Sequence, residues 1–277
     1  MRTKYIFSSR RTGRIEGTNK HRKPYPSIAK EVIKISDIVL EILDARFIGD
    51  TRNKELENLI IKSGKRLIYV LNKSDLVDIN SVKRNVELES MNPFIFISCK
   101  NRRGISDLRT LIKIEAKKEK KDYSRAQVGV IGYPNTGKSS VINILVGRFA
   151  AKTAAEAGFT RGMQKVRMTK GVLIIDTPGV IPEKETGRGQ RNSTKHVQIS
   201  AKMWDKAKDP DIIAFELMKK YPEIEKFYGF DSGKNFDEFI EALGRKMNYL
   251  KRGNLVDTDK TSRKILRDWQ EGKIRQG

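Results

Sequence analysis

The 277-residue sequence predicts an α/β fold with a parallel-rich sheet, followed by a small all-helical domain. Short apolar runs alternate with helix-like stretches in the first part of the chain, and continuous apolar runs are typical of parallel strands covered on both faces. After about residue 183 the strand signal stops, and apolar residues repeat at helical spacing. We therefore expect a basic N-terminal arm at 1–35, an α/β domain at 36–185 and a basic helical domain at 186–277.

The expected strands and helices follow from these periodicities. The apolar runs of strand length are Ile38–Leu43, Leu67–Leu71, Phe94–Ile97, Val128–Ile131 and Val172–Ile175. Helix-like stretches lie between them at 51–63, 105–118 and 138–148. Three further helices are expected, from a capping-box pattern that starts at Asn235, a short segment between Pro222 and Gly229, and the apolar residues Ile265, Leu266 and Trp269.

The balance of charge is the strongest feature of the composition. Lys and Arg number 57 against 34 Asp and Glu, which gives a formal net charge of +23. Such an excess favours a polyanionic partner, and nucleic acid comes first. The alternative is a lysine-rich surface adapted to heat, but that composition normally raises Glu together with Lys.

Other classes of protein fit the sequence poorly. The apolar runs have the length of strands and stay well below the roughly 18 residues of a membrane span. The chain starts with basic residues rather than the apolar block of a signal peptide. The single cysteine, Cys99, fits a reducing compartment. We therefore expect no membrane partner and a cytoplasmic location.

A phosphate-binding pattern lies between an expected strand and an expected helix. The segment Gly132–Ser139 reads GYPNTGKS and matches G-x-x-x-x-G-K-[ST]. Its glycines let successive N–H groups point at phosphates, and the helix N-terminus adds its dipole. We expect Lys138 to reach the β and γ phosphates and Ser139 to give its hydroxyl to Mg²⁺. The expected phosphate-binding residues are Asn135, Thr136, Gly137, Lys138, Ser139 and Ser140.

Two further motifs indicate that the base is guanine. The first, Asn72-Lys-Ser-Asp75, follows an apolar strand and resembles the N-K-x-D motif of GTPases. The Asp75 carboxylate can accept hydrogen bonds from the ring N–H and the exocyclic amine of guanine, which adenine cannot offer. Lys73 would lie along the base, and Asn72 would hold the loop in place.

The second motif, Ser98-Cys-Lys100, ends the next strand and resembles the S-A-K loop, whose backbone amide contacts the guanine carbonyl. We expect Ser98, Cys99 and Lys100 to line the base. Cys99 replaces the usual alanine as a small buried thiol, and we do not expect it to be a nucleophile.

A γ-phosphate motif follows the last apolar strand. Asp176-Thr-Pro-Gly179 resembles D-x-x-G, in which Asp176 would bind Mg²⁺ through water and the Gly179 amide would contact the γ-phosphate. Thr160 is the expected switch threonine on Mg²⁺, while Thr153 lies in the same window and stays an alternative.

The order of these motifs is rearranged. In an ordinary small GTPase the base motifs come last, whereas here they precede the P-loop. Because ligand sites of parallel α/β sheets lie at the carboxyl ends of the strands, a permuted chain can build the same pocket. The old termini would be joined by the helix and lysine-rich link at 105–126. The sequence therefore predicts a circularly permuted, Ras-like P-loop GTPase domain that binds GTP or GDP with Mg²⁺.

With these motifs the chain resembles the circularly permuted GTPases of the YlqF/RbgA type, which help assemble the large ribosomal subunit. The match extends to Asp37-Ile-Val, to Asp44-Ala-Arg46 and to the helical C-terminal part. At Ala157 the sequence departs from the proline that the family often carries. The resemblance implies a Ras-like domain followed by a helical RNA-binding domain, with ribosomal RNA and the large ribosomal subunit as partners. We assume a monomer.

Hydrolysis is expected to be slow without an activator. Val180 stands where Ras-type enzymes carry a water-positioning glutamine. Asn135 resembles the asparagine that holds K⁺ against the phosphates in potassium-stimulated GTPases, with a turn-forming asparagine as the alternative. His21 has the sequence offset of a histidine proposed to assist hydrolysis in bacterial relatives, with an RNA-facing histidine as the alternative. The expected catalytic residues are Lys138, Thr160 and Gly179, with Asn135 and His21 as further candidates.

Three functions are compatible with this sequence. The leading hypothesis is a molecular switch, in which GTP orders the loops around Thr160 and at 176–196 and repositions the helical domain. A second is an RNA-binding chaperone with a mainly structural GTP pocket. A third is a potassium-dependent GTPase in another RNA process.

Overall fold

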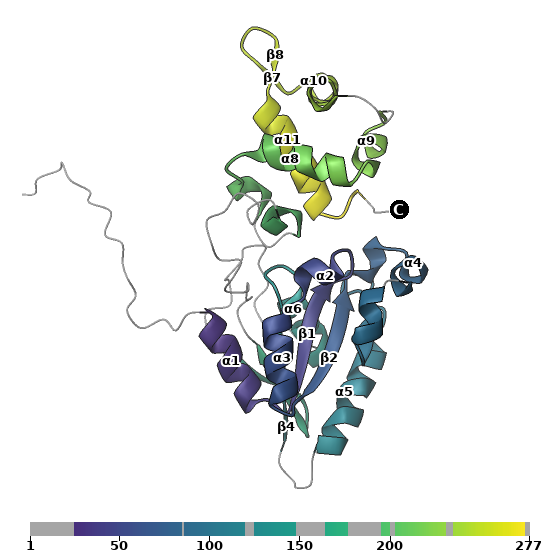
Figure 1. The fold of residues 1–277 in the computed structure, drawn as a ribbon, viewed down its shortest axis with the longest axis vertical. Coiled ribbons are helices and arrows are strands. Elements are labelled where there is room, and N and C mark those ends of the chain that lie inside the picture. The colour runs from purple at the N-terminus through teal and green to yellow at the C-terminus, as the bar shows by residue number, and fades with distance from the viewer. Residues whose placement is uncertain are drawn as a thin grey trace, which may run out of the picture.

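The structure is a computed structural model of the chain, and its fold is shown in Figure 1. It describes residues 25–84, 86–119, 125–147, 164–176, 195–199, 203–230 and 235–274. In these parts of the chain, no helix combines the length and the apolar character needed to cross a membrane.

A six-stranded sheet lies at the centre of the α/β domain, with the strand order β3-β2-β1-β4-β6-β5. Every neighbouring pair is parallel except β5 and β6, which are antiparallel. This confirms the predicted α/β fold with a parallel-rich sheet. The strands are β1 (Ile38–Asp44), β2 (Arg66–Asn72), β3 (Phe94–Phe96), β4 (Ala126–Ile131), β5 (Gln164–Thr169) and β6 (Val172–Asp176).

Helices cover both faces of this sheet (Figure 1). On one face α5 and α6 bury Leu108, Ile112 and Val141 in one apolar cluster. On the other face α1 and α3 bury Ile33 and Ile60 in a second cluster. Two-sided burial explains the continuous apolar runs, since all seven residues of β1 are buried. The helices are α1 (Tyr25–Ile35), α2 (Ile48–Thr51), α3 (Lys54–Lys62), α4 (Ile79–Lys83), α5 (Ile105–Glu119) and α6 (Lys138–Val146), with short 3₁₀ turns at Ser74–Leu76 and Val86–Ser90.

Helix α1 occupies the last third of the predicted basic arm. Its residues Ala29, Val32 and Ile33 are buried, at the i, i+3, i+4 spacing of an amphipathic helix. Residues 25–35 therefore pack as part of the α/β domain, because this apolar stripe outweighs the basic residues on the other face. Residues 1–24 of the arm, including His21, lie outside the described residues.

The helical C-terminal region forms its own core (Figure 1). Asn235 begins α10 as predicted, since its Oδ1 accepts the backbone N–H of Asp237 at 3.0 Å. Trp269 and Phe239 are almost fully buried. The elements are a 3₁₀ turn at Trp204–Lys206, α8 (Pro210–Lys220), α9 (Glu223–Phe227), α10 (Phe236–Lys246), the hairpin strands β7 (Leu250–Lys251) and β8 (Leu255–Val256), and α11 (Thr258–Gln270).

Two residues of the α/β domain have their side chains in this C-terminal apolar core. Phe47, at the start of α2, is 4% exposed and its ring lies 5.8 Å from that of Trp269 and 6.4 Å from that of Tyr221. Tyr133, in the P-loop, is fully buried in the same cluster. The C-terminal region is therefore packed against the edge of the sheet where the predicted nucleotide site lies. The predicted boundary at 185/186 falls outside the described residues.

A buried carboxyl lies in the middle of the central strand. Glu41 of β1 is fully buried, and its Oε1 accepts the backbone N–H of Asn53 at 2.8 Å. The nearby Glu57 pairs with Arg52 at 2.6 Å and accepts the hydroxyl of Tyr69 at 3.0 Å. Burial, and then the negative charge of Glu57, raise the pKa of Glu41 to about 8.

This carboxyl makes the stability of the protein depend on pH. The folded state holds the Glu41 proton more tightly than the unfolded chain, whose carboxyl has the ordinary pKa of 4.5. Its stabilising contribution is therefore fully present below pH 4.5 and is lost as the pH rises through about 8. From this group the free energy of unfolding should fall by at most about 1.4 kcal/mol per pH unit. Urea unfolding between pH 5 and pH 8.5 should show a smaller fall of the free energy of unfolding in Glu41→Gln than in the wild type. Equal slopes of the free energy of unfolding against pH in the two proteins would contradict the prediction.

Candidate nucleotide site

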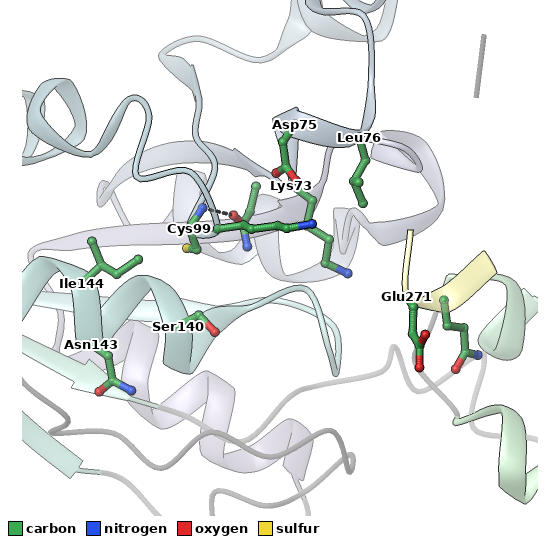
Figure 2. A pocket seen from close by; sticks show the side chains of 11 residues that line it. Lys73, Asp75, Leu76, Cys99, Ser140, Asn143, Ile144 and Glu271 are labelled. Atoms are coloured by element: carbon green, nitrogen blue, oxygen red, sulfur yellow. Dashed lines mark hydrogen bonds between the residues drawn. The ribbon is translucent and has the colours of Figure 1, made fainter. Parts of the chain in front are cut away.

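A cavity of about 520 Å³ lies at the carboxyl ends of β2 and β3, beside α6 (Figure 2). Its volume is within the roughly 300–1,000 Å³ typical of small-molecule sites. It brings together residues from both predicted base motifs and from the predicted P-loop helix. The lining residues are Asn72, Lys73, Asp75, Leu76, Cys99, Lys100, Ser140, Asn143, Ile144, Gln270 and Glu271.

The P-loop connects β4 to α6 with two glycines in backbone conformations that other residues rarely adopt. Gly132 has φ +144° and Gly137 has φ +98°. At Gly137 the space is also closed, because a Cβ there would lie 2.2 Å from Asn72 Nδ2. The buried Lys138 donates its Nζ to the carbonyl oxygen of Tyr133 at 2.7 Å, and the Thr136 hydroxyl donates to the same oxygen at 3.0 Å.

Asn72 joins the base loops to the P-loop. Its Nδ2 donates to the carbonyl oxygen of Thr136 at 2.8 Å, and its Oδ1 accepts the backbone N–H of Cys99 at 3.4 Å. The side chain is buried, so these hydrogen bonds face little competition from water. The segment that would bind phosphate and the two loops that would bind the base are thus held in one fixed relation.

Asp75 is oriented by the second base motif. The Ser98 hydroxyl donates to Asp75 Oδ1 at 2.6 Å and accepts the backbone N–H of Asn101 at 3.1 Å. Cys99 follows directly, and burial, with a smaller contribution from Asp75, raises the pKa of its thiol to about 12. A thiol that stays protonated is a poor nucleophile, as expected for Cys99, although its side chain is only half-buried and lines the cavity.

Lys73 has a left-handed backbone conformation, with φ +63°, and its side chain forms an ion pair at the end of β1. Its Nζ lies 2.7 Å from Asp44 Oδ2, and Arg46 binds the same carboxylate with its Nε at 3.0 Å and its Nη2 at 2.8 Å. Burial alone would raise the pKa of Asp44, but Arg46 and Lys73 hold it well below its usual range. Burial lowers the pKa of Lys73, partly offset by Asp44.

Some predicted site residues are not described. Thr160 and Gly179 lie outside the described residues, as do Thr153, Val180 and His21. Asp176 ends β6, the strand next to β4, but only its backbone is described. Their roles therefore stay predictions.

Asn135 has a left-handed backbone, with φ +60°, and its Nδ2 lies 3.7 Å from Met203 Sδ. Its role as a potassium ligand also stays a prediction. In the described part of the chain, His, Cys, Asp and Glu form no group of three that could hold a metal.

Sequence reasoning missed one wall of the cavity. Gln270 and Glu271 come from the end of α11, in the C-terminal region (Figure 2). No motif links them to the base loops, which precede them by some 170 residues or more. Leu76 is a smaller omission, and its place directly after Asp75 was a signal that could have found it.

The strand order, the P-loop between β4 and α6, and the base loops at the same edge define a P-loop GTPase domain. The base loops precede the P-loop in the chain, so the domain is circularly permuted. Residues 127–227 match a family model described as "50S ribosome-binding GTPase". A GTP-binding protein of Methanocaldococcus jannaschii is 36% identical over 256 residues, which cover 91% of this chain and 66% of that protein.

The guanine nucleotide-binding protein-like NSN1 of Arabidopsis thaliana is 32% identical over 290 residues, covering 92% of this chain and 48% of that protein. The GNP-bound structure of YlqF from T. maritima aligns with a TM-score of 0.61 at 25% identity, covering 89% of this chain and 93% of that one. The chain belongs to the YlqF-type family of circularly permuted GTPases. It spans about half to two thirds of the length of these curated relatives.

The contact between Gly137 and Asn72 can be tested with substitutions at the two glycines that flank α6. In Gly137→Ala the new Cβ would displace the Asn72 amide, and we expect binding of GDP to weaken by at least about tenfold, or roughly 1.4 kcal/mol. Gly147→Ala is the control, since Gly147 also has a positive φ, +76°, but has open space around it. That substitution should lower stability and leave GDP affinity nearly unchanged. Fluorescence titration with a labelled GDP measures both, and equal weakening in the two variants would refute the assignment.

Proposed function

We propose that this protein hydrolyses GTP slowly, as a molecular switch that binds ribosomal RNA and assists assembly of the large ribosomal subunit. The observation that carries the proposal is the cavity in which Asn72 holds the guanine loops against the P-loop. The charge of +23 supports an RNA partner, because phosphate contacts provide most of the sequence-independent affinity for nucleic acid. The description of the matching family model supports the ribosome as the particle that the protein would bind.

The base would be recognised by the residues that line the cavity. Asp75, oriented by Ser98, would accept the ring N–H and exocyclic amine of guanine, and the backbone N–H of Cys99 would donate to its carbonyl. Lys73 and Lys100 would flank the two faces of the ring. This pattern rejects adenine because Asp75 would lose both of its donors.

The phosphates would be bound by the P-loop. Backbone amides of Asn135, Thr136, Gly137, Lys138 and Ser139, with the Ser140 end of α6, would surround them at the positive end of the helix dipole. Lys138, which now donates to the Tyr133 carbonyl, would transfer its hydrogen bond to the β and γ phosphates. The exchange keeps the buried ammonium hydrogen-bonded in both states.

The residues also fit Mg²⁺. Ser139 lies in the first turn of α6, and Asp176 ends β6, the parallel neighbour of β4, so both belong to the same edge of the sheet. We propose Ser139 and Thr160 as direct ligands and Asp176 as a ligand through water. Bound Mg²⁺ would neutralise charge between the β and γ phosphates. Asn135 would hold K⁺ against the phosphates, where the ion would neutralise further negative charge.

Slow hydrolysis follows from Val180, which cannot orient water. Thr160 and the Gly179 amide would contact the γ-phosphate region, and His21 is a further candidate to assist hydrolysis. Binding to a ribosomal particle is the proposed activator. We propose that the protein acts as a monomer in the cytoplasm, where its single cysteine fits a reducing environment.

Specificity for guanine can be tested at Asp75. In Asp75→Asn the side-chain amide presents a donor where guanine also presents donors, so GTP binding should weaken by roughly 100-fold or more, about 3 kcal/mol. Xanthosine nucleotides, which carry a carbonyl in place of the amine, should gain affinity in the same variant. Asp78→Asn is the matched control, because Asp78 is an exposed cap of α4 and Asn also caps helices. Unchanged GTP affinity in Asp75→Asn would exclude this mode of base recognition.

Turnover of GTP tests the switch itself. Steady-state hydrolysis should rise by about tenfold or more when large-subunit particles are added, and should be faster in potassium than in sodium chloride. Lys138→Ala provides the background rate, since it lacks the P-loop cation. If neither particles nor potassium stimulates hydrolysis, while RNA still binds, the protein is instead an RNA-binding chaperone with a structural GTP pocket.

A further inference from the structure

The motif Asp44-Ala-Arg46 links the base loop to the C-terminal region. It begins at the last residue of β1, and its two charged side chains are at most 1% exposed. Arg46 binds Asp44 through two nitrogens and donates its Nη1 to the carbonyl oxygen of Trp269 at 3.1 Å. Asp44 in turn holds Lys73 at 2.7 Å. One continuous chain of polar contacts thus leads from the guanine loop to the last turn of α11.

The charges in this chain of polar contacts explain why the end of α11 takes part in it. Two cations, Arg46 and Lys73, share the single buried carboxylate of Asp44. The last carbonyl groups of a helix lack intrahelical partners and carry a partial negative charge. The Arg46 guanidinium lies against this end of α11, so the helix terminus offsets the excess positive charge together with the nearby Asp75 carboxylate. Without α11, Arg46 would lose a buried acceptor and the arrangement of Lys73 would change with it.

The end of α11 also contacts the base loop directly. Gln270 and Glu271 line the nucleotide cavity opposite α6, and Figure 2 shows Glu271 facing the cavity from the side of Leu76. Gly272 packs so closely on Leu76 that a Cβ there would lie 2.6 Å from Leu76 Cδ1. Leu76 is the residue after Asp75. A displacement of α11 would therefore open the base side of the cavity as well as release Arg46.

We propose that Asp44-Ala-Arg46 couples guanine binding to the docking of the C-terminal region, with Arg46 as the positioning residue between the base loop and α11. The inference rests on a guanine nucleotide occupying the cavity. It assigns a role to the base, which is present in both GTP and GDP, in addition to the role of the γ-phosphate. Coupling of two binding events is reciprocal, so a docked α11 raises the affinity for GDP by the same factor by which GDP stabilises the docked α11.

The first test compares two arginines of the GTPase domain. Arg46→Ala should weaken GDP binding by about tenfold. Arg52→Ala is the control, since Arg52 also binds a carboxylate through two nitrogens, at Glu57, but contacts neither the cavity nor α11. GDP affinity in Arg52→Ala should change by less than about twofold. Equal affinities in the two variants would overturn the proposal.

The second test acts from the C-terminal side, and does not depend on whether Arg46→Ala folds. In Gly272→Ala the new Cβ would displace the Leu76 side chain from its packing on the end of α11, which should weaken GDP binding although residue 272 lies far from the P-loop in sequence. Gly253→Ala is its control, because Gly253 also has a positive φ, +81°, but sits in open space in the same region. GDP affinity should fall several-fold in Gly272→Ala and stay unchanged in Gly253→Ala. Equal GDP affinities in these two variants would count against the proposal.

Hydrogen exchange in the full chain separates coupling from a merely structural role. In the wild type, GDP should slow amide exchange along α11, and the factor should match the loss of GDP affinity in Arg46→Ala. In Arg46→Ala, saturating GDP should no longer protect α11. Exchange in α11 that is the same with and without GDP in the wild type would overturn the proposal. Failure of the wild type to bind GDP at all would instead overturn the proposed function.

Discussion

The side-chain amide of Asn72 is the contact on which the nucleotide site depends. It donates to Thr136 of the P-loop and accepts from Cys99 of the second base loop, so one buried side chain joins three loops that are distant in sequence. Their relation is fixed by hydrogen bonds at one edge of the sheet and not by the order of the chain. This is why the motifs can be permuted: the termini move, while the carboxyl ends of the parallel strands still meet at the same edge.

The sequence predicted the strands in which buried residues form a continuous apolar run. The four inner strands are largely buried and the edge strand β3 is half-buried between apolar residues, so their apolar runs are continuous and were located within a few residues. Strand β5 was missed because it lies at the sheet edge and alternates, with Lys165 and Arg167 exposed around the buried Val166. Helix α1 was placed within a basic arm because basic residues dominate the composition of the whole segment 1–35, while Ala29 and Ile33 decide the packing of the helix.

Within the site, sequence reasoning selected residues that lie together where one short segment carries both the shape and the chemistry. The P-loop and the N-K-x-D motif are such segments, and the structure brings Asn72, Asp75 and Ser140 to one cavity. It failed where a contact depends on the relative placement of two regions. Nothing in the spacing of Gln270 or Glu271 points to a base pocket, because their position follows from the packing of Trp269 on Phe47.

That packing places the C-terminal region on two sides of the candidate nucleotide site. On the phosphate side Tyr133 of the P-loop is buried in the C-terminal core, and on the base side Arg46 reaches the end of α11. GTP and GDP carry the same base, so the base-side contact stabilises docking equally in both states and cannot discriminate between them. Only contacts on the phosphate side can differ between GTP and GDP. The base side would then set how firmly the C-terminal region is held whenever any guanine nucleotide is bound, and the phosphate side would set the difference that a switch requires.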